Sequence, residues 1–103
     1  ELPPIFERIV SAYVFHHFDL AEKVQLLAEL AVHLAPQGRL VIADIAFPDR
    51  NSMENYRRMI GEAWEDEFYW LADESMDALG SAGLRVAFTP VSDCAGVFIM
   101  EKL

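Results

Sequence analysis

The sequence predicts an α/β domain built on a sheet of about four strands, with helices on both faces. Two nearly unbroken apolar runs, residues 8–14 and 39–47, are typical of strands that a sheet buries on both sides. The segment between them repeats apolar residues at steps of three and four, which is the spacing of an amphipathic helix. Two further apolar runs are joined by a short loop, residues 90–95, which fits an antiparallel pair better than a parallel crossover.

Composition limits the chain to one domain and excludes several kinds of partner. The 103 residues are 53% hydrophobic, enough for an ordinary core, and carry a formal net charge of −9. Nucleic acids and anionic membrane surfaces would repel such a chain, so we expect neither as a partner. No apolar run is long enough to cross a bilayer. The single cysteine, Cys94, cannot form an internal disulfide and suits either a reducing cytoplasm or a chain indifferent to redox conditions. Of the two, we expect a cytoplasmic protein.

The first strand begins at Arg8 and ends at Val14, after an irregular lead-in over residues 2–6 that contains a proline pair. Asp19 followed by Glu22 has the spacing of a capping box and predicts where the first helix starts. Pro36 and Gly38 are expected to end that helix. Its apolar stripe consists of Leu20, Val24, Leu27, Ala31 and Leu34.

The second strand, residues 39–47, is interrupted only by Asp44. A strand, a crossover helix and a second strand form a βαβ unit, which is right-handed with very few exceptions. Asp44 is therefore expected near the carboxyl end of its strand, beside residues 11–14, where sheets of this kind bind their ligands. Its side chain either lines a substrate site or bonds backbone amides where the strand ends.

The second half of the chain predicts two helices and a final hairpin. Asn51 or Ser52 is expected to cap a helix that runs to about Ala63, and a short helix at residues 73–82 ends at Gly83. The last two strands are expected at residues 84–89 and 96–101. Residues 64–71 mix four aromatic with three acidic side chains and show no clear period.

Two groups of side chains could carry chemistry. His16 and His17 offer an imidazole that could accept a proton near neutral pH, or that could cap the following helix. We expect no metal site, because adjacent side chains in an extended backbone point in opposite directions. Trp64 and Tyr69 could form an aromatic wall for a substrate, or could belong to the core.

The segments "SAYVFHHF", "LAPQGRLVIADIAF" and "LGSAGLRV", followed by a terminal hairpin, resemble the second half of a class I S-adenosylmethionine-dependent methyltransferase. The resemblance covers residues 6–102 and is greatest to small bacterial members of uncertain substrate. Residues 1–103 are thus expected to be a C-terminal half-domain. The family's Gly-rich cofactor-binding turn belongs to the half that is absent, and the chain contains no G-x-G. It also begins at Glu1 without an initiator methionine, from which we expect either trimming or a fragment.

This resemblance implies a Rossmann-like sheet with strand order first, second, fourth, third, and S-adenosylmethionine as the cofactor of the parent protein. The parent is expected to transfer a methyl group to a small molecule, with His16 as the candidate catalytic residue. The fragment alone is expected to bind the cofactor weakly or not at all and to be inactive. The residues expected at the cofactor are Ser11, Ala12, Tyr13 and Phe15, and those expected to line the substrate are Asp44, Trp64 and Tyr69.

The same strand order leaves the first strand, Arg8 to Val14, at an edge of the sheet. An unpaired apolar edge strand tends to find another strand, so we expect it to pair with the missing N-terminal half or with a second copy of the chain. The alternative function is a non-enzymatic half-domain that self-associates through this edge. Another nucleotide-binding α/β domain is a third option, but the terminal hairpin argues against a purely parallel sheet.

Overall fold

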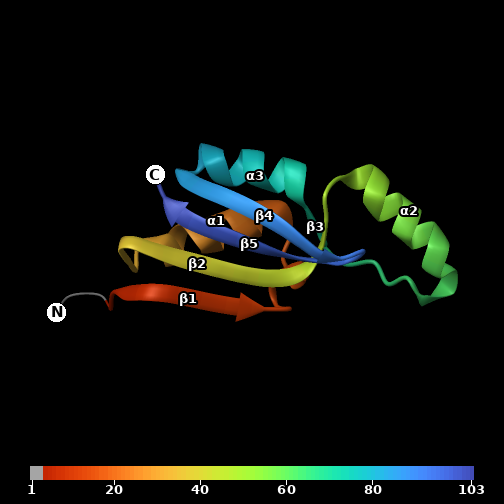
Figure 1. Cartoon of the computed structure of the whole chain (residues 1–103), viewed down its shortest axis with the longest axis horizontal. Coiled ribbons are helices and arrows are strands. Elements are labelled where there is room, and N and C mark those ends of the chain that lie inside the picture. Colours follow the sequence, from red (N-terminus) through yellow and green to blue (C-terminus); the bar gives the residue numbers. More distant parts are fainter. Residues whose placement is uncertain (1–3) are drawn as a thin grey trace.

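The computed structural model of the chain describes residues 4–103, so the predicted lead-in at residues 2–6 lies partly outside the described residues. Its five-stranded sheet has the path β1 (Phe6–Ala12), β2 (Leu34–Phe47), β5 (Ala95–Lys102), β4 (Leu84–Ser92), and β3 (Trp70–Leu71) pairs with the end of β2 (Figure 1). β1 is parallel to β2, whereas β5 is antiparallel to both of its neighbours. The predicted α/β class and strand order are confirmed.

Three helices connect these strands: α1 (Leu20–Ala31), α2 (Arg50–Ile60) and α3 (Ala72–Ser81). The capping box of α1 is confirmed, because the Asp19 carboxylate accepts from the Glu22 amide at 2.8 Å and the Glu22 carboxylate accepts from the Asp19 amide at 3.0 Å. Gly83 has the left-handed φ of +91° expected where α3 ends.

The cap predicted for α2 was wrong by two or three residues. Asp49, in extended backbone, caps this helix and accepts a hydrogen bond from the Ser52 amide at 2.8 Å. These bonds to Ser52 hold the pKa of Asp49 below its usual value. Asp49 precedes Ser52 by three residues, the spacing a capping carboxylate needs, so it fills the role that the sequence interpretation gave to Asn51 or Ser52.

Strand ends also differ from the prediction. β1 covers Phe6–Ala12 rather than residues 8–14, because the backbone turns at Tyr13, whose φ is +59°, into a 3-10 turn at Phe15–His17. β2 begins at Leu34, so the proline and glycine expected to end the first helix lie inside a strand. Phe6 donates its amide to the His33 carbonyl at 2.7 Å, which extends the pairing of β1 with β2 to that point.

The helices α1 and α3 cover the same face of the sheet, which differs from the expected helices on both faces. Their buried residues Leu27 and Leu79 belong to one core cluster with Leu40, Ile42 and Phe98 of the strands. The alternate residues of β2 point the other way and are half-exposed. Helix α2 buries none of its side chains and projects beyond the end of the sheet (Figure 1). Apolar side chains on both sides of β2 misled the prediction, because the chain's own helices cover only one side.

Two glycines provide a test of this packing. A β-carbon at Gly96 would collide with the Phe88 ring on the covered face, whereas one at Gly80, inside α3, would meet nothing within 4 Å. We expect Gly96→Ala to lower the free energy of unfolding by about 1–3 kcal/mol through overpacking. The control Gly80→Ala should raise it by about 0.5–1 kcal/mol, because glycine weakens a helix interior. Urea denaturation would measure both, and a Gly96→Ala variant as stable as the wild type would contradict the packing.

Candidate functional site

The candidate site lies where β1 and β2 end at their carboxyl termini. Ala12 is paired with Ala43, and the Tyr13 amide donates to the Ala43 carbonyl at 2.8 Å, so the two chains stay side by side up to this point. The 3-10 turn at Phe15–His17 then brings His16 across the end of β2, above Asp44. The expected neighbourhood of Asp44 and residues 11–14 is therefore present in the structure.

Asp44 is a buried carboxylate held by three donors. It is 1% exposed, and its Oδ1 accepts from the Ile45 amide at 2.8 Å and lies 2.7 Å from His16 Nδ1. Its Oδ2 accepts from the indole Nε1 of Trp70 at 3.1 Å. Asp44 thus bonds one backbone amide, as the second reading expected, and its remaining contacts are two ring nitrogens. Because the carboxylate is fully covered, its contacts are with the protein alone.

These contacts determine the tautomer of His16. The Trp70 indole and the Ile45 amide can only donate, so both Asp44 oxygens serve as acceptors. With Asp44 ionised and His16 neutral, the remaining short contact requires the hydrogen on Nδ1, which donates it to Asp44, and Nε2 then keeps a free lone pair. The His16 side chain is 13% exposed. An imidazole fixed in this form by a carboxylate has the arrangement of a general base.

Aromatic rings extend from His16 along the same side of the site. The Tyr69 ring centroid lies 6.4 Å from that of His16, 5.0 Å from that of Trp64 and 6.1 Å from that of Phe47. Burial, followed by the charges of Glu67 and its acidic neighbours in the sequence, raises the pKa of Tyr69. Trp64 and Tyr69 are both half-buried, so they form a continuous aromatic surface next to His16.

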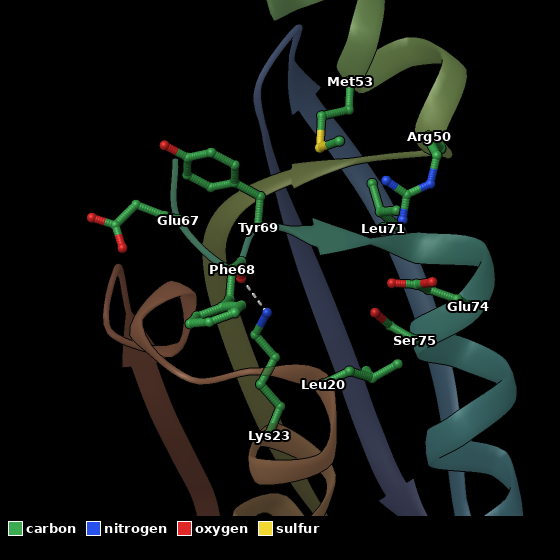
Figure 2. Close-up of a pocket in the computed structure, with 10 residues that line it drawn as sticks. All are labelled: Leu20, Lys23, Arg50, Met53, Glu67, Phe68, Tyr69, Leu71, Glu74 and Ser75. Carbon is green, nitrogen blue, oxygen red and sulfur yellow. Dashed lines mark hydrogen bonds between the residues drawn. The ribbon is translucent and has the colours of Figure 1, made fainter. Parts of the chain in front are cut away.

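A buried lysine lies behind this network. Lys23 of α1 is 2% exposed; its Nζ donates to the Phe68 carbonyl and lies 4.7 Å from the centroid of the Trp70 ring. Figure 2 shows the side chain reaching from α1 to Phe68, with Arg50 and Glu74 on the far side of the same cavity, which has a volume of about 200 Å³. Burial lowers the pKa of Lys23 to about 8, although the charges of nearby carboxylates oppose this shift.

The residues expected at a cofactor differ in how exposed they are. Ser11 is half-buried inside β1, and Ala12 and Tyr13 are exposed at its end, with Tyr13 56% exposed. Phe15 is 3% exposed and packs on Phe18 and Trp70, so its ring is not free to face a cofactor. The spacing of aromatic residues in the sequence did not indicate that Phe15 is buried, because Phe15 lies in a turn that folds back into the core.

The geometric argument about His16 and His17 was also wrong. It assumed extended backbone, but both residues lie in a 3-10 turn and their ring centroids are 4.2 Å apart. His17 is exposed and lies 3.8 Å from a Glu67 carboxylate oxygen. Across residues 4–103, no group of three or more His, Cys, Asp or Glu side chains is arranged to hold a metal ion. In the same span, no helix combines the length and apolar character that crossing a bilayer requires.

Two residues of this site, Lys23 and Trp70, were not identified from the sequence. Lys23 falls three residues after Leu20 and four before Leu27, on the buried side of α1, and a lysine at such a position was the available signal. Trp70 was grouped with the other aromatics of residues 64–71, but it is fully buried and bonds Asp44. Only the pairing of β3 with β2 brings it there.

Known proteins resemble the chain in both sequence and fold, although no protein-family model matches it. An uncharacterized methyltransferase of Geobacillus kaustophilus is 35% identical over 110 residues, which cover 98% of this chain and 50% of that protein. One from Bacillus subtilis is 31% identical over 108 residues, covering 94% of the chain and 48% of the relative. The chain spans about half the length of the curated relatives it matches. The chain matches the C-terminal half of a class I methyltransferase.

Solved structures share the fold of this half-domain. The pyocyanin biosynthetic protein PhzM superposes with a TM-score of 0.73 at 16% identity, over 100% of this chain and 32% of that one. CalO1, a methyltransferase of calicheamicin biosynthesis described in its SAH-bound form, superposes with a TM-score of 0.71 at 18% identity, over 98% of this chain and 31% of that one.

The buried carboxylate makes a direct prediction about stability. Asp44→Asn places an amide nitrogen, itself a donor, among three donors, so at least one buried donor loses its partner. We expect the free energy of unfolding to fall by about 1–3 kcal/mol. The exposed Asp77 on α3 is the control, and Asp77→Asn should change stability by less than about 0.5 kcal/mol. Equal urea midpoints for the two variants would rule out the network around Asp44.

Proposed function

We propose that the parent protein transfers a methyl group from S-adenosylmethionine to a small-molecule nucleophile, with His16 as the general base. The observation that carries this proposal is the 2.7 Å contact between His16 Nδ1 and the buried Asp44 carboxylate, at the strand ends of a methyltransferase half-domain. A carboxylate that fixes the imidazole tautomer leaves Nε2 able to take a proton from an oxygen or nitrogen acceptor.

The bound cofactor supplies an electrophilic methyl group. The residues of this chain would hold the acceptor in line with it, remove its proton and exclude water. In-line positioning accounts for much of the rate in such a reaction, so few side chains need to touch the reacting atoms. Trp64 and Tyr69 would form the acceptor's wall beside His16. Ser11, Ala12 and Tyr13 would contact the cofactor, largely through backbone, because Ser11 lies inside β1 and Ala12 has no polar side chain.

The other wall of the site is expected from the remaining half of the methyltransferase domain. Within residues 4–103, β1 pairs only with β2, so its second edge is open to another strand. The uncovered face of the sheet adds a broader contact. Strand register aligns Val10, Val41, Ile99 and Ala87 in one row across this face, and Ala12, Ala43, Val97 and Thr89 in the next.

This uncovered face has the character of an interface. Val10 on the edge strand β1 is 69% exposed and Ile99 on the central strand β5 is 37% exposed, so aliphatic side chains stand open to solvent across this face. Charged residues lie two positions further along the strands from the row that contains Val10. Arg8 of β1 is paired with Arg39 of β2, and Arg85 of β4 lies 3.9 Å from Glu101 of β5. An apolar surface bordered by arginines suits a partner with apolar helices and acidic ends. The remaining half of the domain meets this description if its helices cover the face as α1 and α3 cover the other.

The alternative function is a non-enzymatic half-domain that self-associates. The observation that favours it is the same unpaired edge of β1, which could pair with β1 of a second copy. The two functions differ in what completes the sheet: in the first, a different polypeptide segment, and in the second, an identical chain.

The catalytic proposal predicts different effects for two adjacent histidines. In the complete methyltransferase, His16→Ala should lower kcat by about 10²–10⁴-fold, because it removes the proton acceptor next to Asp44. His17→Ala should leave kcat nearly unchanged, since His17 is exposed and does not contact Asp44; its ring lies 4.2 Å from that of His16 and 3.8 Å from a Glu67 carboxylate oxygen. Methyl transfer from labelled S-adenosylmethionine would be followed with a panel of phenol, amine and thiol acceptors. Equal rates for His16→Ala and wild type would refute the role of His16.

The fragment by itself is expected to bind S-adenosylhomocysteine weakly or not at all. Titration calorimetry of the chain alone should show no binding at micromolar concentrations, because the chain supplies one wall of the site. Adding the complementary half of the domain should restore binding and give a one-to-one complex by light scattering. Tight binding by the chain alone would contradict the proposal, and a stable dimer that ignores the complementary half would favour self-association.

A further inference from the structure

Lys23 contacts two of the groups that hold the His16–Asp44 pair, the Phe68 backbone and the Trp70 ring, and has no hydrogen bond to either member of the pair. We propose that Lys23 is a positioning residue that holds the Phe68 backbone and the Trp70 ring against this pair. The catalytic meaning of the proposal rests on the proposed function, whereas the holding itself is a property of the fold and can be measured without cofactor or substrate.

The first contact is through the backbone of Phe68. Its amide donates to the His16 carbonyl at 2.9 Å, and its carbonyl accepts from Lys23 Nζ. Both polar backbone groups of this residue are thus used, one by His16 and one by Lys23. The Phe68 side chain is 55% exposed, so packing does not fix the segment here. The two hydrogen bonds join residue 68 to the turn that carries His16 on one side and to Lys23 of α1 on the other.

The second contact is through the ring of Trp70. Lys23 Nζ lies 4.7 Å from the ring centroid, within the range of a cation–π interaction. The same indole donates to Asp44 Oδ2 at 3.1 Å. The ammonium group of Lys23 is therefore connected to His16 through the Phe68 backbone and to Asp44 through the Trp70 ring.

The surroundings of Lys23 explain why a charged group can remain there. Asp44 of β2, Glu74 of α3 and Asp19 at the cap of α1 all favour its protonated form, and Glu67 and Arg50 line the same cavity. Burial is the larger effect and lowers the pKa from 10.5 to about 8. An apolar side chain would fill this position without the desolvation penalty, but it could not bond the Phe68 carbonyl.

The sign of the linkage follows from this lowered pKa. Between about pH 8 and 10.5 the unfolded chain keeps the Lys23 proton while the folded chain loses it. The burial of Lys23 therefore costs stability at neutral pH, and this cost is relieved as the pH rises through that range. The hold on Phe68 and Trp70 should loosen over the lower part of the same range, because a neutral amine is a weaker donor and no longer a cation.

Three variants test the proposal by NMR of the folded chain. Lys23→Met removes the ammonium group, Lys23→Arg keeps a cation, and Lys102→Met is a matched control. Lys102, the second of the two lysines in the sequence, donates to the Leu34 carbonyl at 2.8 Å, away from the pair. The readouts are the ring tautomer of His16 from its nitrogen shifts and the indole N–H resonance of Trp70.

We expect wild type and Lys102→Met to show one His16 tautomer, with the hydrogen on Nδ1, and a Trp70 resonance typical of a bonded indole. Lys23→Met should show a mixture of tautomers and a Trp70 resonance shifted towards that of free indole, and Lys23→Arg should recover part of the difference. Unchanged His16 and Trp70 signals in Lys23→Met would overturn the proposal, because they would show that Lys23 only fills space.

A pH titration of the wild type keeps the proposal testable even if Lys23→Met does not fold. The carbon-bound ring protons of His16 and Trp70 should shift together with a midpoint near pH 8 in wild type and in Lys102→Met. The absence of a shared transition between pH 7 and 10 would overturn the proposal. Failure of the methyl-transfer assay together with a positive titration would refute the proposed function and leave the positioning role intact, so the two failures are distinguishable.

Discussion

The buried carboxylate of Asp44 is the constraint on which the rest of this structure depends. A carboxylate that is 1% exposed is tolerated only if donors surround it, and its three donors come from separate parts of the chain. The Ile45 amide is local, His16 comes from the turn after β1, and Trp70 from β3. The bond from Trp70 to this carboxylate acts together with the pairing of β3 and β2 to place the segment at residues 64–71, and with it the aromatic surface beside His16.

The parts of the fold that the sequence predicted are those that depend on local chemistry. The capping box at Asp19, the left-handed residue at Gly83 and the antiparallel hairpin each follow from residues a few positions apart. The burial of Phe15 and the roles of Lys23 and Trp70 could not be predicted in this way. They depend on contacts between residues far apart in the sequence, such as Lys23 and Phe68, which are 45 residues apart. The spacing of apolar residues along the chain does not indicate such contacts.

The placement of the helices links the incomplete sheet to the incomplete site. Because α1 and α3 share one face, the other face carries rows of apolar residues such as Val10 and Val41, and β1 has a free edge. The exposed Ala12 and Tyr13, proposed to contact the cofactor, lie at the end of that same strand. In this account, a single partner segment would cover the face, pair with β1 and close the cofactor site. Fold completion and cofactor binding are then one event.

The most direct test of this account is a crystal structure of the complete methyltransferase with S-adenosylhomocysteine bound. The account predicts that the cofactor sulfur lies at the carboxyl end of β1, next to Ala12 and Tyr13, with His16 Nε2 facing the acceptor space in front of it and with the Asp44 contact at Nδ1 intact. A cofactor bound elsewhere, or a His16 ring turned away from Asp44 and from the cofactor, would contradict it.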